Sequence, residues 1–244
     1  MTRGSSSIYL FRGSIPREST ISRKRPVCPV ILIDEVGQAS IDKVRIIATW
    51  MDVKSRLSIK DVFNSFPDKK KDVEVKYNNT TLDERIRIYD NLLALDFDVY
   101  DSFDTTVPPS IQTIVRSQYH CSINYNELRY LYQLWDVICR ATSDHPGKVD
   151  IVIDNPPFEI HAHLLSLHDM LRRTGVNIQW FIAVPSRHEV ELQIHDFIAG
   201  LDYDIIMNQR DFMDESDTIG RTRSHHLASI SSDFCARRKV EKGV

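Results

Sequence analysis

Runs of apolar residues that end in acids stand out along this chain. Residues 29–37 (PVILIDEVG) contain four consecutive apolar residues, three of them β-branched, followed by two carboxylates and a glycine. Such a run indicates a strand that is buried on both faces and ends at the acids. Residues 149–154 (VDIVID) also end in an aspartate. A buried carboxylate is costly unless a positive charge lies beside it, so these two strand ends are the first candidates for a functional site.

The periodicity of the other segments predicts further strands and several helices. Three more stretches have the alternation or apolar content of strands: residues 44–53, 97–103 and 177–184. Helical spacing marks residues 58–66, 81–95, most of 108–141, about 159–173, and 189–200. Thr81 and Glu84 predict a capping box at the start of one helix, and Gly200 predicts the C-terminal end of another. The order, strands first and then helix–strand alternation, predicts an α/β fold with a mixed β-sheet flanked by helices.

Composition places the chain among ordinary globular proteins. Its 244 residues, 42% hydrophobic and 27% charged, are enough for one substantial domain. No apolar run approaches the ~20 residues that span a bilayer, and the N-terminus has no signal-peptide core. The four cysteines are scattered without a Cys-x-x-Cys pair, which is typical of a reducing compartment. We therefore expect a cytoplasmic protein without a membrane partner.

The net charge of −3 conceals basic ends on an acidic body. Residues 1–28 carry six Lys and Arg residues against one Glu, and residues 221–244 carry six against two acids. We expect three regions: a flexible basic arm at 1–28, the folded domain at 29–207, and an irregular basic tail at 208–244 with one helical pattern near 227–238. Both basic ends are consistent with contacts to a phosphate backbone and also with plain solvated tails.

Four acids are placed to share one site. Asp34 and Asp154 end the two buried strands, Asp196 lies on the helix after the last strand, and Glu74 precedes a helix. Converging carboxylates repel one another unless cations lie between them, and Mg²⁺ or Mn²⁺ binds oxygen ligands of this kind. Two such cations clamp a phosphoryl group during in-line displacement. The pattern predicts a metal-dependent nuclease whose catalytic residues are Asp34, Glu74, Asp154 and Asp196, with Asp34, Asp154 and Asp196 as metal ligands.

Four short motifs contain these acids in order. They are Asp34-Glu35-Val36-Gly37, Glu74-Val75-Lys76, Val152-Ile153-Asp154, and residues 192–200 (LQIHDFIAG) with Ser186 ahead of them. Over residues 29–201 the chain resembles the domain-of-unknown-function 3800 (DUF3800) family, which is regarded as ribonuclease H–like. The resemblance implies a ribonuclease H–like fold and a nuclease that hydrolyses phosphodiester bonds. Val36 stands where the family usually has Ser, and His195 stands where it usually has Ala.

Four residues beside the acids are predicted to contact a nucleic-acid substrate: Glu35, Lys76, Gln193 and His195. Gln193 lies three residues before Asp196, on the same face of the predicted helix. Lys76 and His195 are the groups expected to meet the scissile phosphate. No side chain can be assigned to a ribose 2′-hydroxyl, so RNA, DNA and hybrid substrates all stay open.

Two other classes of function compete with the nuclease. Residues 155–158 (NPPF) follow a strand and are similar to the motif with which adenine-N6 methyltransferases hold a flipped base. Such an enzyme also needs a glycine-rich turn for its cofactor, and none of the eight glycines here form a Gly-x-Gly. The third class is a non-catalytic nucleic-acid or protein-binding module with the same fold.

Overall fold

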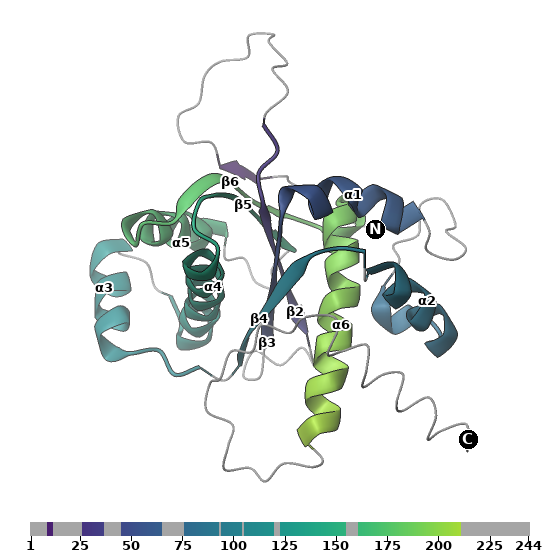
Figure 1. Ribbon diagram of the computed structural model, residues 1–244. Coiled ribbons are helices and arrows are strands. Elements are labelled where there is room, and N and C mark those ends of the chain that lie inside the picture. The colour runs from purple at the N-terminus through teal and green to yellow at the C-terminus, as the bar shows by residue number, and fades with distance from the viewer. Residues whose placement is uncertain are drawn as a thin grey trace, which may run out of the picture.

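The protein is built around a single sheet. The computed structural model describes residues 9–11, 26–36, 45–64, 76–92, 94–103, 105–119, 123–154 and 161–210. Six strands form within these residues. They are β1 (Tyr9–Phe11), β2 (Val30–Val36), β3 (Arg45–Met51), β4 (Phe97–Phe103), β5 (Lys148–Asp154) and β6 (Asn177–Val184). The strand order is β1-β6-β5-β2-β3-β4 (Figure 1).

The directions of the strands make this a mixed sheet. β2, β3 and β4 form an antiparallel meander, in which Asp34 pairs with Ile47 and Ile47 pairs with Asp101. β5 runs parallel to both β2 and β6, and the short β1 runs antiparallel to β6. The predicted α/β class and mixed sheet are therefore confirmed.

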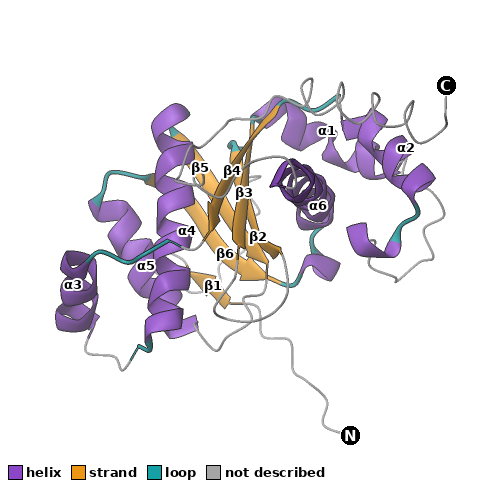
Figure 2. Cartoon of the chain, turned by 90° about the horizontal axis from the view of Figure 1, so that it is seen from below, coloured by secondary structure: helices purple, strands orange, loops and turns teal. Residues whose placement is uncertain are grey.

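Helices cover both faces of the sheet. They are α1 (Val53–Asn64), α2 (Leu82–Leu92), α3 (Pro109–Tyr119), α4 (Tyr125–Asp144), α5 (His161–Arg173) and α6 (Val190–Arg210), with two 3₁₀ turns, η2 (Tyr77–Asn79) and η3 (Ser186–His188). Figure 2 shows α3, α4 and α5 on one side of the sheet and α1, α2 and α6 on the other. The described residues thus form three layers with the sheet in the middle.

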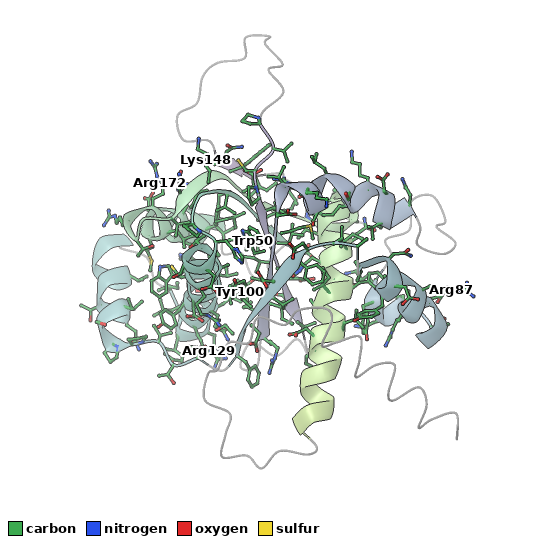
Figure 3. All side chains as sticks on the ribbon, viewed as in Figure 1. Trp50, Arg87, Tyr100, Arg129, Lys148 and Arg172 are labelled. Carbon is green, nitrogen blue, oxygen red and sulfur yellow. The ribbon has the colours of Figure 1, made fainter. Side chains whose placement is uncertain are left out.

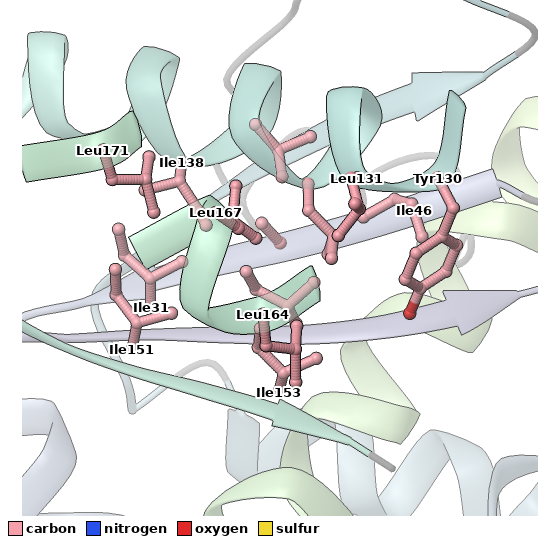
Figure 4. Packing of buried hydrophobic residues seen from close by; sticks show 14 of the residues in the cluster. Ile31, Ile46, Tyr130, Leu131, Ile138, Ile151, Ile153, Leu164, Leu167 and Leu171 are labelled. Carbon is pink, nitrogen blue, oxygen red and sulfur yellow. The ribbon is translucent and has the colours of Figure 1, made fainter. Parts of the chain in front are cut away.

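The alternation of side chains along β2 builds two separate cores. Val30 and Leu32 are fully buried in the layer of α6, while Ile31 and Ile33 are fully buried in the layer of α4 and α5 (Figure 4). Each such side chain contributes roughly 1.5–3 kcal/mol relative to an exposed position. Large aromatic side chains such as Tyr100 complete the packing (Figure 3). Burial on both faces explains why this strand has no polar alternation.

Side-chain caps decide where several helices begin. The predicted capping box is present, since the Thr81 N–H donates to Glu84 Oε2 at 2.7 Å just before α2. The helical stretch predicted at 108–141 is two helices, because Asn124 and Glu127 form a second capping box that opens α4. The predicted helix at 58–66 was placed too late. α1 begins at Val53, where the preceding Asp52 accepts a hydrogen bond from the Ser55 amide at 2.7 Å.

The end of α6 differs most from the prediction. The helix does not stop at Gly200 but continues to Arg210, three residues past the expected domain boundary. Gly200 does not have the left-handed backbone of a C-terminal cap, which in the described residues is adopted by Gly147 and Gly175. It is a buried residue inside the helix, and its lack of a side chain serves close packing instead.

Several expectations lie outside the described residues. Apart from β1, these include most of the basic arm, the tail beyond Arg210, Glu74 and residues 155–158. Among the helices that the structure describes, none has the length and apolar content to cross a membrane.

Candidate active site

Asp34 and Asp154 lie at the same end of the sheet on neighbouring parallel strands. β2 and β5 pair through Ile33 and Ile153, the residues just before the two acids. Both acids face the layer of α6, as do the apolar residues two positions earlier on each strand. The carboxyl ends of parallel strands are where α/β folds place their sites, and here two such ends present carboxylates side by side.

Asp34 is the centre of a group of interacting negative charges. Burial raises the pKa of Asp34 well above its usual range, and the charges of Asp154 and Asp196 raise it further. The Glu35 amide donates to Asp34 Oδ1 at 2.7 Å and partly opposes this shift. The charge of Asp196 on α6 thus acts on Asp34 at the end of β2. That Asp34, Asp154 and Asp196 converge on one metal site stays a prediction.

Backbone amides orient the other two carboxylates. The Ser186 N–H donates to Asp154 Oδ1 at 2.8 Å, which ties the end of β5 to η3. The Tyr77 N–H donates to Asp196 Oδ2 at 2.6 Å, which ties α6 to η2. The two carboxylates are thus held by the turns η3 and η2, so the packing of these turns sets the directions in which Asp154 and Asp196 point.

Glu35 belongs to the same charge group but faces the opposite layer. Burial raises the pKa of Glu35 to about 7, against a hydrogen bond from the Tyr130 hydroxyl, and the charge of Asp154 raises it further. Tyr130 comes from α4 and points its hydroxyl toward the sheet (Figure 4). Burial, followed by the charge of Glu35, raises the pKa of Tyr130 as well. Glu35 Oε2 is buried without a hydrogen-bond partner in the described part of the chain.

Two residues predicted to contact substrate have structural positions instead. His195 is fully buried, and its ring nitrogens contact Thr49 Oγ1 at 2.9 Å and the Ile47 carbonyl oxygen at 3.1 Å. Burial lowers the pKa of His195 to about 3, so the ring is neutral at physiological pH. Gln193 is also buried and donates to the Ser186 carbonyl oxygen at 3.2 Å. These positions do not fit contacts with a scissile phosphate.

Lys76 is adjacent in sequence to a residue that contacts one of the acids. It is exposed and directly precedes Tyr77, whose amide is bonded to Asp196. The fourth predicted catalytic acid, Glu74, is outside the described residues, as is the Asn155–Phe158 motif of the competing methyltransferase hypothesis.

Sequence reasoning did not identify Tyr130, Tyr77 and Gly200 as parts of the site. Tyr130 follows the helical spacing of an ordinary core residue, and nothing in that spacing shows that its hydroxyl reaches Glu35. Gly200 did give a signal, a lone glycine four residues after Asp196, but a helix end explained it equally well.

The donor chemistry fits Mg²⁺ or Mn²⁺, although no coordination set is preformed. Hard carboxylate oxygens are the usual ligands of these cations, and a cation removes the repulsion that, after burial, raises the pKa of Asp34. Within the described residues, no three His, Cys, Asp or Glu side chains are already arranged to hold a metal ion.

Comparisons with known proteins find likenesses among solved structures. No family model matches the chain, and no curated protein matches it either. Among solved structures, the chain is similar to the ribonuclease H2 from Pyrococcus horikoshii OT3, with 16% sequence identity and a TM-score of 0.44. That match covers 88% of this chain and 89% of the other.

Proposed function

We propose that this protein is a divalent-metal-dependent nuclease that hydrolyses phosphodiester bonds. The observation that carries the proposal is the position of Asp34, which follows Ile33 on β2 beside the end of the parallel strand β5 and whose carboxylate interacts with the charges of Asp154 and Asp196. A concentration of negative charge at the carboxyl ends of a sheet is expensive for the fold. Cations and a phosphate group in the site would offset this cost.

Each acid has a defined part in this proposal. Asp34 would be shared by two cations, and Asp154 and Asp196 would each hold one. Mg²⁺ or Mn²⁺ supplies an activated water and stabilises the leaving oxygen when bound. Glu74 is retained as the fourth catalytic acid on sequence grounds, and Lys76, which precedes the Tyr77 amide that binds Asp196, would meet a phosphate. Glu35 stays next to the cluster, held by Tyr130.

The four motifs support the finer proposal that the chain is related to the DUF3800 family. They occur in the family's order, and the mixed sheet with helices on both faces is the architecture that this resemblance implies. We infer a nucleic acid as the substrate, with RNA, DNA and hybrids as the classes to be tested.

The test is the variant Asp34→Asn in the full chain. It keeps the shape of the side chain but removes the charge shared by the cations, so cleavage in Mn²⁺ should fall by orders of magnitude. The thermal midpoint in a metal chelator should hold or rise, because one buried repulsive carboxylate is gone. Labelled single-stranded, duplex and hybrid substrates are assayed with and without Mn²⁺.

Asp150→Asn is the matched control, because Asp150 lies on β5 at the other end of the sheet. Asp150 forms an ion pair with Arg56 at 2.6 Å. Removal of its charge should lower the free energy of unfolding by a few kcal/mol. Cleavage measured at temperatures below the thermal midpoint of this variant should be unchanged. Cleavage by Asp34→Asn at the wild-type rate would refute the nuclease assignment. Binding of S-adenosylmethionine without Mn²⁺-dependent cleavage would support the methyltransferase, and neither property would support a pure binding module.

A further inference from the structure

Tyr77 and Gly200 form a close contact between η2 and α6. The Tyr77 side chain is buried, and it lies directly against the backbone of Gly200. A Cβ atom added at Gly200 would overlap the Tyr77 ring. The contact therefore exists only because residue 200 has no side chain.

The same tyrosine also holds a candidate metal ligand. Its amide donates to Asp196 Oδ2 at 2.6 Å, and Asp196 lies one helical turn before Gly200, on the same face of α6. Further contacts fix the ring from other sides. Phe197 meets it edge-on with centroids 6.0 Å apart, and the Arg85 guanidinium lies 3.9 Å over its centroid. Ring and amide thus form one rigid connection to α6.

We propose that the Tyr77–Gly200 contact is a positioning device for Asp196. The distance between the ring and the helix sets where the Tyr77 amide lies, and the amide directs the Asp196 carboxylate. A hydrogen bond weakens steeply once its atoms separate, so a displacement of η2 by one methyl group disturbs the carboxylate. Partners that orient a ligand carboxylate strongly affect metal affinity. This inference rests on the proposed function, and it explains why α6 contains a glycine at its centre.

The contact has a second consequence for Lys76. Because Lys76 is bonded directly to Tyr77, its backbone is held beside Asp196 by the same packing. The acid that would bind a cation and the lysine that would meet a phosphate therefore share one anchor.

The experiment compares Gly200→Ala, Tyr77→Ala and the double variant in the full chain. Mn²⁺ binding is measured by calorimetry well below the thermal midpoint, so that only folded protein is titrated. We expect Gly200→Ala to weaken Mn²⁺ binding by about tenfold or more. In the Tyr77→Ala background the added methyl meets only the Cβ atom of residue 77 and no ring, so Gly200→Ala should weaken the affinity clearly less than it does in the wild-type background. Thermal midpoints of the same proteins should show the same non-additivity.

Tyr89→Ala is the control for loss of a buried aromatic side chain. Tyr89 lies on α2 in the same core layer, and its removal should not rescue Gly200→Ala. If Gly200→Ala is too unstable for titration, Tyr77→Ala alone should still bind Mn²⁺ more weakly than Tyr89→Ala does. Unchanged Mn²⁺ affinity in Gly200→Ala, or equal weakening in both backgrounds, would overturn the positioning role alone. A wild-type chain that binds no Mn²⁺ would overturn the proposed function and this role with it.

Discussion

Asp202 is a buried acid on α6 that has no part in the proposed reaction. Its side chain is 2% exposed, and Oδ1 has no hydrogen-bond partner in the described part of the chain. The pKa of Asp202 is raised to about 7, first by burial and then by the charge of Asp101, against the opposing charge of Arg45. The same carboxyl in an unfolded chain has a pKa near ~3.9.

This difference in pKa predicts a pH-dependent stability. Between about pH 4 and pH 7 the folded chain holds a proton that the unfolded chain has released, so the contribution of Asp202 to stability falls as the pH rises. We expect Asp202→Asn to remove that loss. The variant should match the wild type near pH 4 and exceed it by a few kcal/mol near pH 8. Urea unfolding of both proteins across this range measures the difference.

Asp101→Asn is the control for Asp202→Asn. Asp101 pairs with Arg45 at 2.6 Å, so loss of its charge should lower stability at both ends of the pH range. A difference between wild type and Asp202→Asn that stays constant with pH would show that Asp202 is ionised alike in both states.

At the scale of elements, α6 is fixed to the sheet through a buried neutral histidine. The His195 Nε2–H faces the Ile47 carbonyl oxygen and must donate, which leaves Nδ1 to accept from the Thr49 hydroxyl. These two bonds join the middle of β3 to the turn of α6 that also carries Asp196. The register of the helix on the sheet, and hence the height of the carboxylate, depends on them.

Thr49→Val tests this connection. The side chain keeps its shape but leaves His195 Nδ1 without a donor, so the free energy of unfolding should fall by about 1–3 kcal/mol. Thr49→Ser retains the hydroxyl and should lose less. Urea unfolding at neutral pH measures both. A valine variant as stable as the wild type would mean that the hydrogen bond contributes nothing net.

How well the elements can be predicted depends on what defines their ends. β2 and β5 are predictable to within about a residue, because burial on both faces gives a mostly apolar run, broken in β5 only by Asp150, that stops at Asp34 or Asp154. Helix ends depend on single capping side chains, and the Asp52 cap of α1 lies inside what reads as the end of a strand. A glycine in a helical pattern fits either the end of the helix or a close contact inside it. At Gly200, only the packing of Tyr77 distinguishes the two.

At the scale of the whole molecule, the acids at the two ends of β5 differ in their charged partners. At one end, Arg56 joins Asp150 at 2.6 Å and Glu191 at 2.9 Å, so that acids are paired and connect α1, β5 and α6. At the other end, the acids around Asp34 repel one another. The fold thus neutralises Asp150 and Glu191 with arginine and leaves repulsion at Asp34, where a ligand can relieve it.

The same division explains which parts of the site are visible in the sequence. Asp34 and Asp154 follow from the ends of parallel strands, which a linear pattern encodes. Tyr77 and Tyr130 come from segments far apart in the chain, and their contacts depend on how the layers pack. The spacing of residues in the sequence does not show these contacts. For the same reason the sequence predicts His195 at the substrate, although in the structure it faces β3.

The basic arm gives a last prediction about the whole molecule. Its segment at 12–25 leaves β1 after Phe11 and rejoins the described chain at Pro26, whose carbonyl oxygen accepts from Gln179 Nε2 at 3.0 Å. Pro26 lies four residues before the start of β2, whereas the acids lie toward its end. We therefore expect the arm to contribute affinity for a phosphate backbone and not chemistry.

Changing Arg17, Arg23, Lys24 and Arg25 to Gln removes four positive charges and keeps β1. Binding, measured in the inactive Asp34→Asn background, should weaken, and its salt slope should become shallower by up to about 3–4 if each charge contacts a phosphate of a duplex. Turnover at saturating substrate should stay nearly unchanged in the otherwise wild-type chain. Exchanging the three arginines for lysines keeps the charge, so that variant should retain the slope. An unchanged slope after the change to Gln would mean that the arm is only solvated, and a loss of turnover would place it in the active site.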